Sequence, residues 1–191
     1  STYTPTAEVS DASNVLTIGT GYTDTAGNTG AGGTSANYVI DGVDPTVSSI
    51  TVSDTALKAG ETATLTIVFS EAVAAFSSAD DVSVASGSVN TMTTSDSITW
   101  TGTLTPTTDT EDDSNVVSVA ASYTDTLGND GGAGTSANYA VETLAPSVSS
   151  ITFADTSLIG GETSLVTIVF SEAVAAFTND DLTIVNGAMS A

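Results

Sequence analysis

A stretch of 32 residues occurs twice in this chain, and that repetition constrains its fold more than any other feature. Residues 45–76 and 146–177 are identical at 23 of 32 positions, at an offset of 101 residues. Two shorter strings return at the same offset: Tyr-Thr-Asp-Thr-x-Gly-Asn, from Tyr22 and Tyr123, and then Thr-Ser-Ala-Asn-Tyr. A fixed period of this length indicates one folded unit that is copied along the chain.

The period divides the chain into three parts. Residues 1–43 are the C-terminal part of one repeat, residues 44–144 are a complete repeat, and residues 145–191 are the N-terminal part of the next. Both ends therefore fall inside a repeat, where a cut leaves unpaired strand edges and half a core. We expect the chain to be a portion of a much longer tandem array.

Apolar residues of the complete repeat alternate with Thr and Ser at a period of two, which is typical of half-buried strands. Three inward-facing sets are expected: Ala63, Leu65, Ile67 and Phe69; Ile98, Trp100 and Leu104; and Val117, Val119, Ala121 and Tyr123. Shorter strands are marked by Ile50 and Val52, Val82 and Val84, Val89, and Tyr139 and Val141. About seven short strands per repeat predict an all-β fold of tandem immunoglobulin-like antiparallel β-sandwiches. Trp100 is expected to be the single large core anchor.

The composition excludes several kinds of function. The chain has 23 acidic side chains against one Lys or Arg, a net charge of −22, so it lacks the cations that nucleic acid binding requires. It also has no His and no Cys, which excludes thiol nucleophiles, disulfides and Ser/His/Asp triads. No run of about 18 apolar residues is present that would span a membrane.

The short motifs follow one another in a characteristic order. They are Pro-x-Val-x-x-Ile, Gly-Glu-Thr, Phe-Ser-Glu-Ala-Val, Asp-Asp, Trp-Thr-x-Thr-Leu-Thr-Pro, Tyr-x-Asp-x-x-Gly-Asn and Ser-Ala-Asn-Tyr. Over essentially the whole chain this order resembles the bacterial Ig-like repeats of very large secreted surface proteins, such as biofilm and RTX-type adhesins. The resemblance implies an extracellular location at the bacterial cell surface and Ca²⁺ binding at loops and domain junctions. It leaves adhesins, surface layers and appendages open as alternatives.

Acidic residues gather in the loops expected at the two ends of the sandwich. Counting strands up and down places the loops of Glu71, Asp96 and Asp125 at the end that faces the preceding repeat. Stacked repeats would bring one set of carboxylates to that junction: Glu8, Asp11, Asp41, Asp44, Glu71, Asp96 and Asp125. The next junction would collect a second set: Asp109, Asp112, Asp113, Glu142 and Glu172. Ca²⁺ takes about six to eight oxygen ligands in irregular geometry, so we hypothesise that it bridges these loops and stiffens the array.

Two other interpretations of the acidic residues remain open. They can simply keep a Thr-rich surface soluble and self-repelling. In the Asp-x-x-Gly-Asn turns, Asp24 and Asp125 can either ligate a metal or cap the turn through backbone N–H groups, with Gly27 or Gly128 supplying a positive φ.

The favoured function is a structural spacer or stalk of a giant extracellular, adhesin-like surface protein, which holds a distal module that binds a glycan or other surface ligand. Its partners would be neighbouring repeats of the same chain. One alternative is a subunit of a surface layer or extracellular filament, in which other copies are the partners and one chain completes its neighbour's sandwich.

Two further functions are alternatives to the spacer. A glycan- or ice-binding module would use flat Thr-rich sheet faces, built from Thr64, Thr66, Thr99, Thr101 and Thr103. For an enzyme, Glu71 with Asp125 is the best available carboxylate pair for glycoside hydrolysis. Because nothing indicates an enclosed pocket in so small a sandwich, we expect the chain not to be an enzyme.

Overall fold

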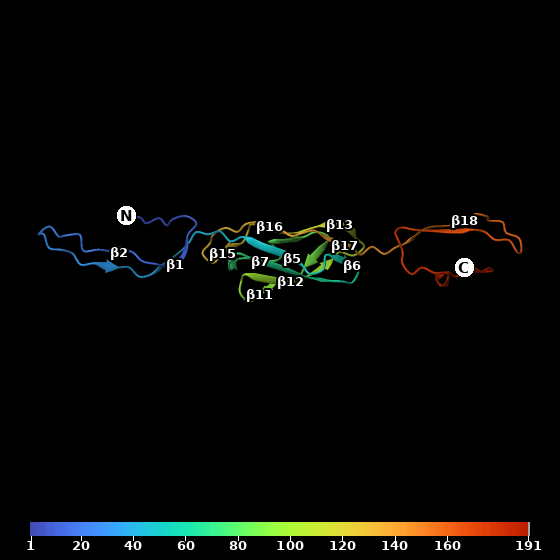
Figure 1. The fold of residues 1–191 in the computed structure, drawn as a ribbon, viewed down its shortest axis with the longest axis horizontal. Coiled ribbons are helices and arrows are strands. Elements are labelled where there is room, and N and C mark those ends of the chain that lie inside the picture. The colour runs from blue at the N-terminus through green and yellow to red at the C-terminus, as the bar shows by residue number, and fades with distance from the viewer. Residues whose placement is uncertain (191) are drawn as a thin grey trace. The chain divides into compact units, whose positions relative to one another are not determined.

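The structure, a computed structural model, describes residues 1–190 and divides them into two compact units, Ser1–Thr143 and a second that begins at Leu144 (Figure 1). Its strands recur at the period of the sequence. In the first part-repeat, β1 (Ser10–Asn14) pairs antiparallel with β4 (Tyr38–Asp41). In the complete repeat, β13 (Glu111–Asn115) pairs in the same way with β17 (Tyr139–Glu142), and both pairs carry a bulge at the same place.

The complete repeat contains strands β5 to β17, coloured cyan to orange in Figure 1. Besides β13 and β17 they are β5 (Val47–Val52), β6 (Ala56–Lys58), β7 (Ala63–Phe69), β8 (Val73–Ala74), β9 (Val82–Val84), β10 (Gly87–Val89), β11 (Thr93–Thr94), β12 (Thr99–Pro106), β14 (Val117–Val119), β15 (Thr124–Asp125) and β16 (Gly134–Thr135).

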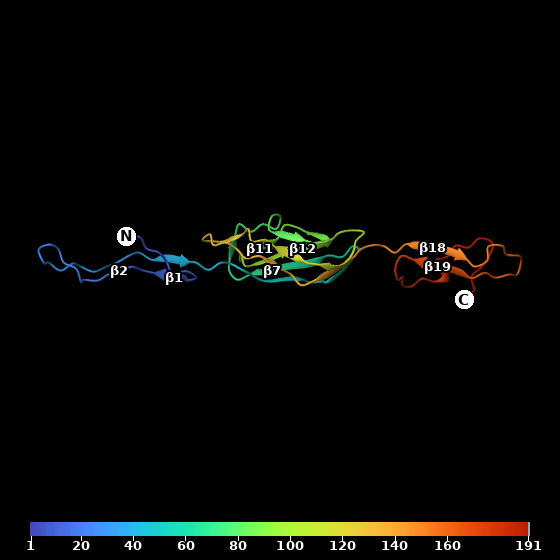
Figure 2. The same cartoon turned by 90° about the horizontal axis from the view of Figure 1, so that it is seen from above.

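These strands form two packed layers (Figures 1 and 2). One layer has the order β10-β12-β7-β5, with β11 beside β12, and all of its pairs are antiparallel. The other layer consists of β9-β14-β16 and β6-β17-β13. The chain crosses from the first layer to the second between β5 and β6, and β6 then pairs with β17 in parallel. The predicted antiparallel β-sandwich is thereby confirmed.

The core lies between the two layers and follows the predicted alternation. On β7, Ala63, Leu65, Ile67 and Phe69 are buried, whereas Thr64 between the first two is exposed. Successive side chains of a strand point to opposite faces, so one face of β7 is apolar and the other carries two threonines and a valine. Burying each large aliphatic or aromatic side chain contributes about 1.5–3 kcal/mol, which makes this strand a major source of stability.

Three expectations about the core were wrong. Ile98, which precedes β12, is only half-buried and does not belong to the core cluster. Ala121 is exposed, because β14 ends at Val119 before the chain turns toward Tyr123. Trp100 is only partly buried: its ring packs edge-on against Phe76 at 4.9 Å, and its Nε1 donates to the Ser97 carbonyl. An indole N–H needs a hydrogen-bond partner, which favours a place at the rim of the core.

The largest fully buried side chains are instead Tyr123, Tyr139 and Phe69. Both tyrosine hydroxyls donate hydrogen bonds to backbone carbonyls, that of Tyr123 to Gly132 and that of Tyr139 to Ala85. A buried hydroxyl must be paired, so each tyrosine fixes one loop to the sandwich.

The part-repeats contain the remaining regular elements. In residues 1–43, β2 (Thr17–Ile18) pairs with β3 (Gly33–Thr34). In the second unit, β18 (Val148–Phe153) pairs with β19 (Val166–Phe170), and a single 3₁₀ turn covers Asn179–Asp181. Among residues 1–190, no helix is long and apolar enough to cross a membrane.

Candidate metal centre

Three carboxylates from three separate segments of the first unit converge at one end of the complete repeat. Asp41 ends β4 and begins the linker, Glu71 lies in the loop between β7 and β8, and Asp125 ends β15. One oxygen of each side chain lies within 4.8 Å of the corresponding oxygens of the other two. We call these three residues the acidic trio; all three belong to the set predicted for this junction.

Strand pairing positions two members of the acidic trio. In the pair formed by β8 and β15, Asp125 lies opposite Val73. Val73 follows Glu71 by two residues in the sequence, so the pairing brings the two carboxylates to the same end of the sandwich. The loop that contains Asp96 and Ser97 lies at the same end of the sandwich, because the N–H of Val73 donates to the carbonyl of Ser97. The loops that carry Glu71, Asp96 and Asp125 therefore share one end of the sandwich, as the strand count predicted.

Asn129 brings the third member to the trio. Its side-chain Nδ2 donates to Asp125 Oδ2 at 2.6 Å and to the backbone carbonyl of Asp41 at 3.1 Å. The amide thus holds the linker against the turn that carries Asp125. Sequence reasoning did not assign this role, although the Gly-Asn that ends Tyr-x-Asp-x-x-Gly-Asn, present at Asn28 and Asn129, was a usable signal.

Asp125 also caps its own turn. Its Oδ1 accepts hydrogen bonds from the N–H groups of Leu127, Gly128 and Asn129 at 2.6–2.9 Å, and Gly128 has a φ of 98°. Burial acts to raise the pKa of Asp125, but these bonds and that of the Asn129 side chain outweigh it, so the pKa lies below its ordinary value. Asp125 is 2% exposed, and its Oδ2 accepts a hydrogen bond from the Asn129 side chain, which leaves this oxygen lone-pair capacity for a cation.

The same turn occurs at Asp24 without the trio. Asp24 Oδ1 accepts from the N–H groups of Ala26 and Asn28, and Oδ2 accepts from the Asn28 side chain. The hydrogen bonds from Asn28 hold the pKa of Asp24 below its ordinary value. Turn capping, one of the two interpretations left open, therefore holds at both aspartates.

The pKa of Glu71 shows that the three carboxylates repel one another. Its pKa is raised, first by burial and then by the negative charges of Asp41, Asp125 and Asp44. Two like charges at such a separation repel by about 1 kcal/mol in bulk water, and by more where water is displaced. A bound cation would remove this repulsion, so the arrangement is suited to hold an ion.

The other carboxylates predicted for this junction lie outside the acidic trio. Asp96 caps the turn before β12 by accepting from the N–H groups of Ile98 and Thr99, and these bonds lower its pKa. Asp11 accepts from the N–H of Ser13. Asp44 is exposed in the linker, and Glu8 is exposed in a turn with a φ of 57°.

The carboxylates predicted for the next junction are placed by local contacts. Asp112 accepts from the Ser86 hydroxyl and the Ser114 N–H, whereas Asp109 and Asp113 are exposed. Glu142 lies on β17 beside Lys58 of β6, and Glu172 belongs to the second unit, just after β19. Within residues 1–190, the acidic trio is the one group of three potential ligands at this spacing, so a second site stays a prediction.

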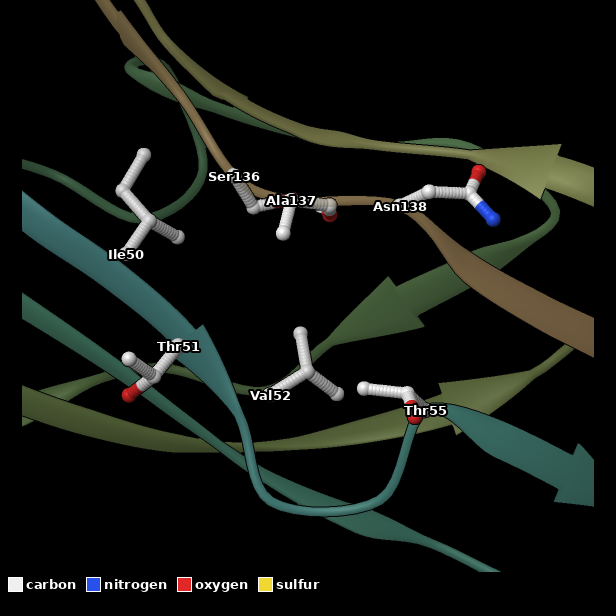
Figure 3. Close-up of a pocket in the computed structure, with 7 residues that line it drawn as sticks. All are labelled: Ile50, Thr51, Val52, Thr55, Ser136, Ala137 and Asn138. Carbon is white, nitrogen blue, oxygen red and sulfur yellow. Dashed lines mark hydrogen bonds between the residues drawn. The ribbon is translucent and has the colours of Figure 1, made fainter.

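A shallow groove of about 150 Å³ lies on the complete repeat in the first unit. Figure 3 shows Ile50 and Val52 of β5, with Thr55, facing residues 136–138 across it. None of its lining residues is acidic or basic, so it offers no acid–base pair and no charged metal ligand.

The family of the chain follows from its match to a known domain. The family model of the bacterial Ig-like domain matches residues 41–141 and again 142–191. The chain belongs to the bacterial Ig-like domain family. Bacterial Ig-like domains usually occur in surface proteins and are typically non-catalytic. Comparison with curated proteins and with solved structures finds no match.

Proposed function

We propose that these bacterial Ig-like repeats form the spacer or stalk of a large extracellular surface protein, and that Ca²⁺ bound by the acidic trio stiffens the join between repeats. The observation that carries the proposal is the origin of the three carboxylates. Asp41 comes from the linker that leaves one repeat, whereas Glu71 and Asp125 come from two loops of the next. An ion held by all three would restrain the linker against the sandwich.

The ligand set favours Ca²⁺ over other common metal ions. It contains only oxygen, because the chain has no His and no Cys. Each of the three carboxylates offers one oxygen to a shared ion, and water completes the coordination shell of about six to eight oxygens that Ca²⁺ takes. Mg²⁺ requires near-octahedral geometry with short bonds, which a mixture of linker and loop ligands suits less well.

The period of the sequence supports a device copied along an array. Glu142 and Glu172 stand 101 residues after Asp41 and Glu71, and Asp24 stands 101 residues before Asp125. Each type of ligand therefore occurs twice in the chain. In a solenoid-like array, stability depends on each unit and on its nearest-neighbour joins, so one ion per join would set stiffness and reach.

The test is thermal unfolding of the 191-residue chain in chelator and in excess Ca²⁺. Fluorescence of Trp100, the one Trp, reports the complete repeat alone. Ca²⁺ at 100 times its Kd should raise the free energy of unfolding by about 2.7 kcal/mol. Asp125→Asn should abolish this rise, whereas Asp24→Asn, which damages the same turn outside the trio, should leave it intact.

Stiffness needs its own measurement, because an ion can stabilise a loop without restraining a linker. Small-angle scattering of the same chain should show a narrower distribution of conformations in Ca²⁺ than in chelator. If Tm and scattering are both unchanged by Ca²⁺, the carboxylates are solvated surface groups and the spacer has no ion-dependent stiffness.

A second candidate function rests on the register of the exposed sheet face. Thr101 lies opposite Thr93 on one side and Thr66 on the other, and Thr66 lies opposite Thr51. The hydroxyl-bearing residues thus form a row across four strands, which is a plausible surface for a glycan or for ice. Thermal hysteresis and glycan-array binding of the chain test it, with Thr101→Asp in the middle of the row as the disrupting variant.

A further inference from the structure

One sheet edge is open in the middle of the complete repeat. β5 is the last strand in the order β10-β12-β7-β5, and within residues 1–190 it pairs with β7 alone. Backbone hydrogen bonds join it to the other layer at both ends, from the Gly132 N–H to the Pro45 carbonyl and from the Ala140 N–H to the Thr55 carbonyl. Between these two bonds lies the groove of Figure 3. The middle of β5 is therefore accessible from the side.

The register of β5 shows which of its backbone groups are unpaired. The Ser53 N–H donates to the Thr64 carbonyl, and the residues of an antiparallel strand bond a given neighbour alternately. Thr51 therefore bonds β7, whereas the N–H and C=O groups of Ile50 and Val52 point to the open edge. Such a row of unpaired backbone groups is a template for another strand.

The opposite edge of the same layer is protected, whereas this one is not. At the opposite edge, β10 and β11 are only three and two residues long. Between them Asn90 Oδ1 accepts the Thr103 N–H at 2.7 Å, so a side chain interrupts the ladder. Short and interrupted edge strands discourage pairing with another chain. β5 has six residues and contains neither a charged residue nor a proline, so it lacks this protection.

The distribution of charge favours a second copy of the chain as the occupant of this edge. Strands β5, β7, β10, β11 and β12 contain no charged residue, whereas β6, β13 and β17 of the other layer do. Two copies with a net charge of −22 each repel one another over most of their surfaces. They meet the least repulsion where the uncharged layer ends in an open strand.

We propose that two copies of the chain pair antiparallel through β5, about a two-fold axis at Thr51. This register places Ile50 of each copy opposite Val52 of the other, so the free N–H and C=O groups of these residues bond one another. The apolar side chains of both copies then lie on the groove side, and the two Thr51 side chains meet on the exposed face. The contact uses the same patch twice, so it is isologous.

The groove and the repeat both support this pairing. The groove provides room beside Ile50 and Val52 for the inward side chains of the added strand, under the small side chains of Ser136 and Ala137. β18 has the sequence of β5 except for Phe153 in place of Val52, so the edge sequence returns with the repeat. One contact of this size is weak, but several along two neighbouring stalks reinforce one another.

The first test measures the mass of the 191-residue chain by sedimentation at increasing concentration. Chelator is present throughout, so that divalent ions do not bridge acidic surfaces and the pairing is tested separately from the acidic trio. The mass should rise beyond one chain, and at lower concentration in high salt, because salt screens the remaining repulsion.

Two variants locate the contact. Thr51→Asp should keep the chain single, because like charges opposite each other on paired strands are destabilising. Thr105→Asp, on the exposed face of β12, is the matched control and should assemble like the unaltered chain. Both positions are exposed, so neither change alters the core, and the Tm from Trp100 fluorescence checks that both variants fold.

The second test fixes the register. The chain has no Cys, so an introduced one reports without background. Thr51→Cys should form disulfide-linked pairs, because residues opposite each other without direct backbone bonds have Cα atoms about 4.5 Å apart, within disulfide range. Ser49→Cys, on the same face of the same strand, should not, because its two copies would lie about 13 Å apart along the strands.

Three results would overturn the proposal. A mass of one chain at every concentration and salt would show that the edges do not pair. Association that Thr51→Asp leaves intact would place the contact elsewhere on the chain. Equal linking of the two cysteine variants would show random collision in place of a defined register.

Discussion

At the scale of single residues, two copies of one aspartate-capped turn differ in their surroundings. Asp24 and Asp125 cap identical Asp-x-x-Gly-Asn turns, with Gly27 and Gly128 at φ values of 91° and 98°. Asp24 is exposed, whereas Asp125 is buried beside Glu71. The turn is a local property of the sequence, but membership of the acidic trio depends on the neighbouring linker and loop.

Glu71→Gln is expected to stabilise the complete repeat in chelator at pH 7. The folded state raises the pKa of Glu71 above its ordinary 4.5, so it binds the proton more tightly than the unfolded state does. The free energy of unfolding should therefore fall as the pH rises from about 4.5 through the higher pKa of the folded state, and the variant should lack this loss. Because Glu71 is partly exposed, the expected gain in the free energy of unfolding is about 0.5 kcal/mol, which corresponds to a rise of a few degrees in Tm.

The measurement is Trp100 fluorescence during thermal unfolding, repeated across this pH range. Glu172→Gln, the equivalent change in the second unit, is the matched control and should leave the Tm of the complete repeat unchanged. A lower Tm for Glu71→Gln in chelator would contradict the assignment of repulsion to this carboxylate.

At the scale of elements, one tyrosine anchors the loop between β15 and β16. The Tyr123 ring packs against Phe69, and its hydroxyl bonds the Gly132 carbonyl at 2.7 Å. The backbone of Gly131 passes directly over this ring, and the N–H of Gly132 donates to the Pro45 carbonyl at the start of the repeat. The loop that carries Asp125 is thereby tied to the core and to the incoming linker.

Gly131→Ala is expected to destabilise the complete repeat strongly. An added Cβ would lie 2.4 Å from the Tyr123 ring, which is fully buried and cannot move aside. Overpacking of this kind lowers the free energy of unfolding by about 1–3 kcal/mol. Gly30→Ala makes the matched contact with Tyr22, a half-exposed ring that can rotate away, so it should have little effect. Tm values of both variants check this, and equal losses would contradict it.

At the scale of the whole molecule, order is concentrated in one repeat. The buried core cluster is built from residues 50–141, whereas residues 1–43 and 145–190 contain no fully buried side chain. Half a sandwich buries too little apolar surface to offset the conformational entropy of its chain. The complete repeat is therefore the one part of the described chain that carries its own core.

Hydrogen exchange is expected to show this difference directly. At a concentration where the chain is single, amides of β7 and β12 should be the most protected, because both strands are paired on both sides. Amides of β1 to β4, β18 and β19 should exchange faster by orders of magnitude, since their opening exposes little further surface. Mass spectrometry of peptides from each region measures this, and equal protection throughout would contradict a single ordered core.

How much of this fold and site could be read from the sequence depends on the range of the interaction involved. The period of 101 residues, the strands with alternating apolar residues and the Asp-x-x-Gly-Asn turns could be predicted, because alternation and positive φ at glycine are local properties. The sequence did not predict β6, β8, β11, β13, β15 and β16, which are short or lack that alternation. The burial of β7 followed from the same alternation. The rim position of Trp100 and the exposure of Ala121 could not be predicted, because they depend on where a strand ends and which side chain reaches a hydrogen-bond acceptor.

The candidate metal centre divides in the same way. The sequence determined which loops meet at one end, since strand count and antiparallel order settle that, and Asp41, Glu71 and Asp125 were among the carboxylates predicted there. Only the tertiary structure decided that these three converge, while Asp96 and Asp11 turn to backbone N–H groups. The reason is physical. The carboxylate of an aspartate in a turn accepts hydrogen bonds from nearby backbone N–H groups, whatever the rest of the fold does. Carboxylates that are far apart in the sequence come together only where a tertiary contact, such as that of Asn129 with the Asp41 carbonyl, holds their two segments together.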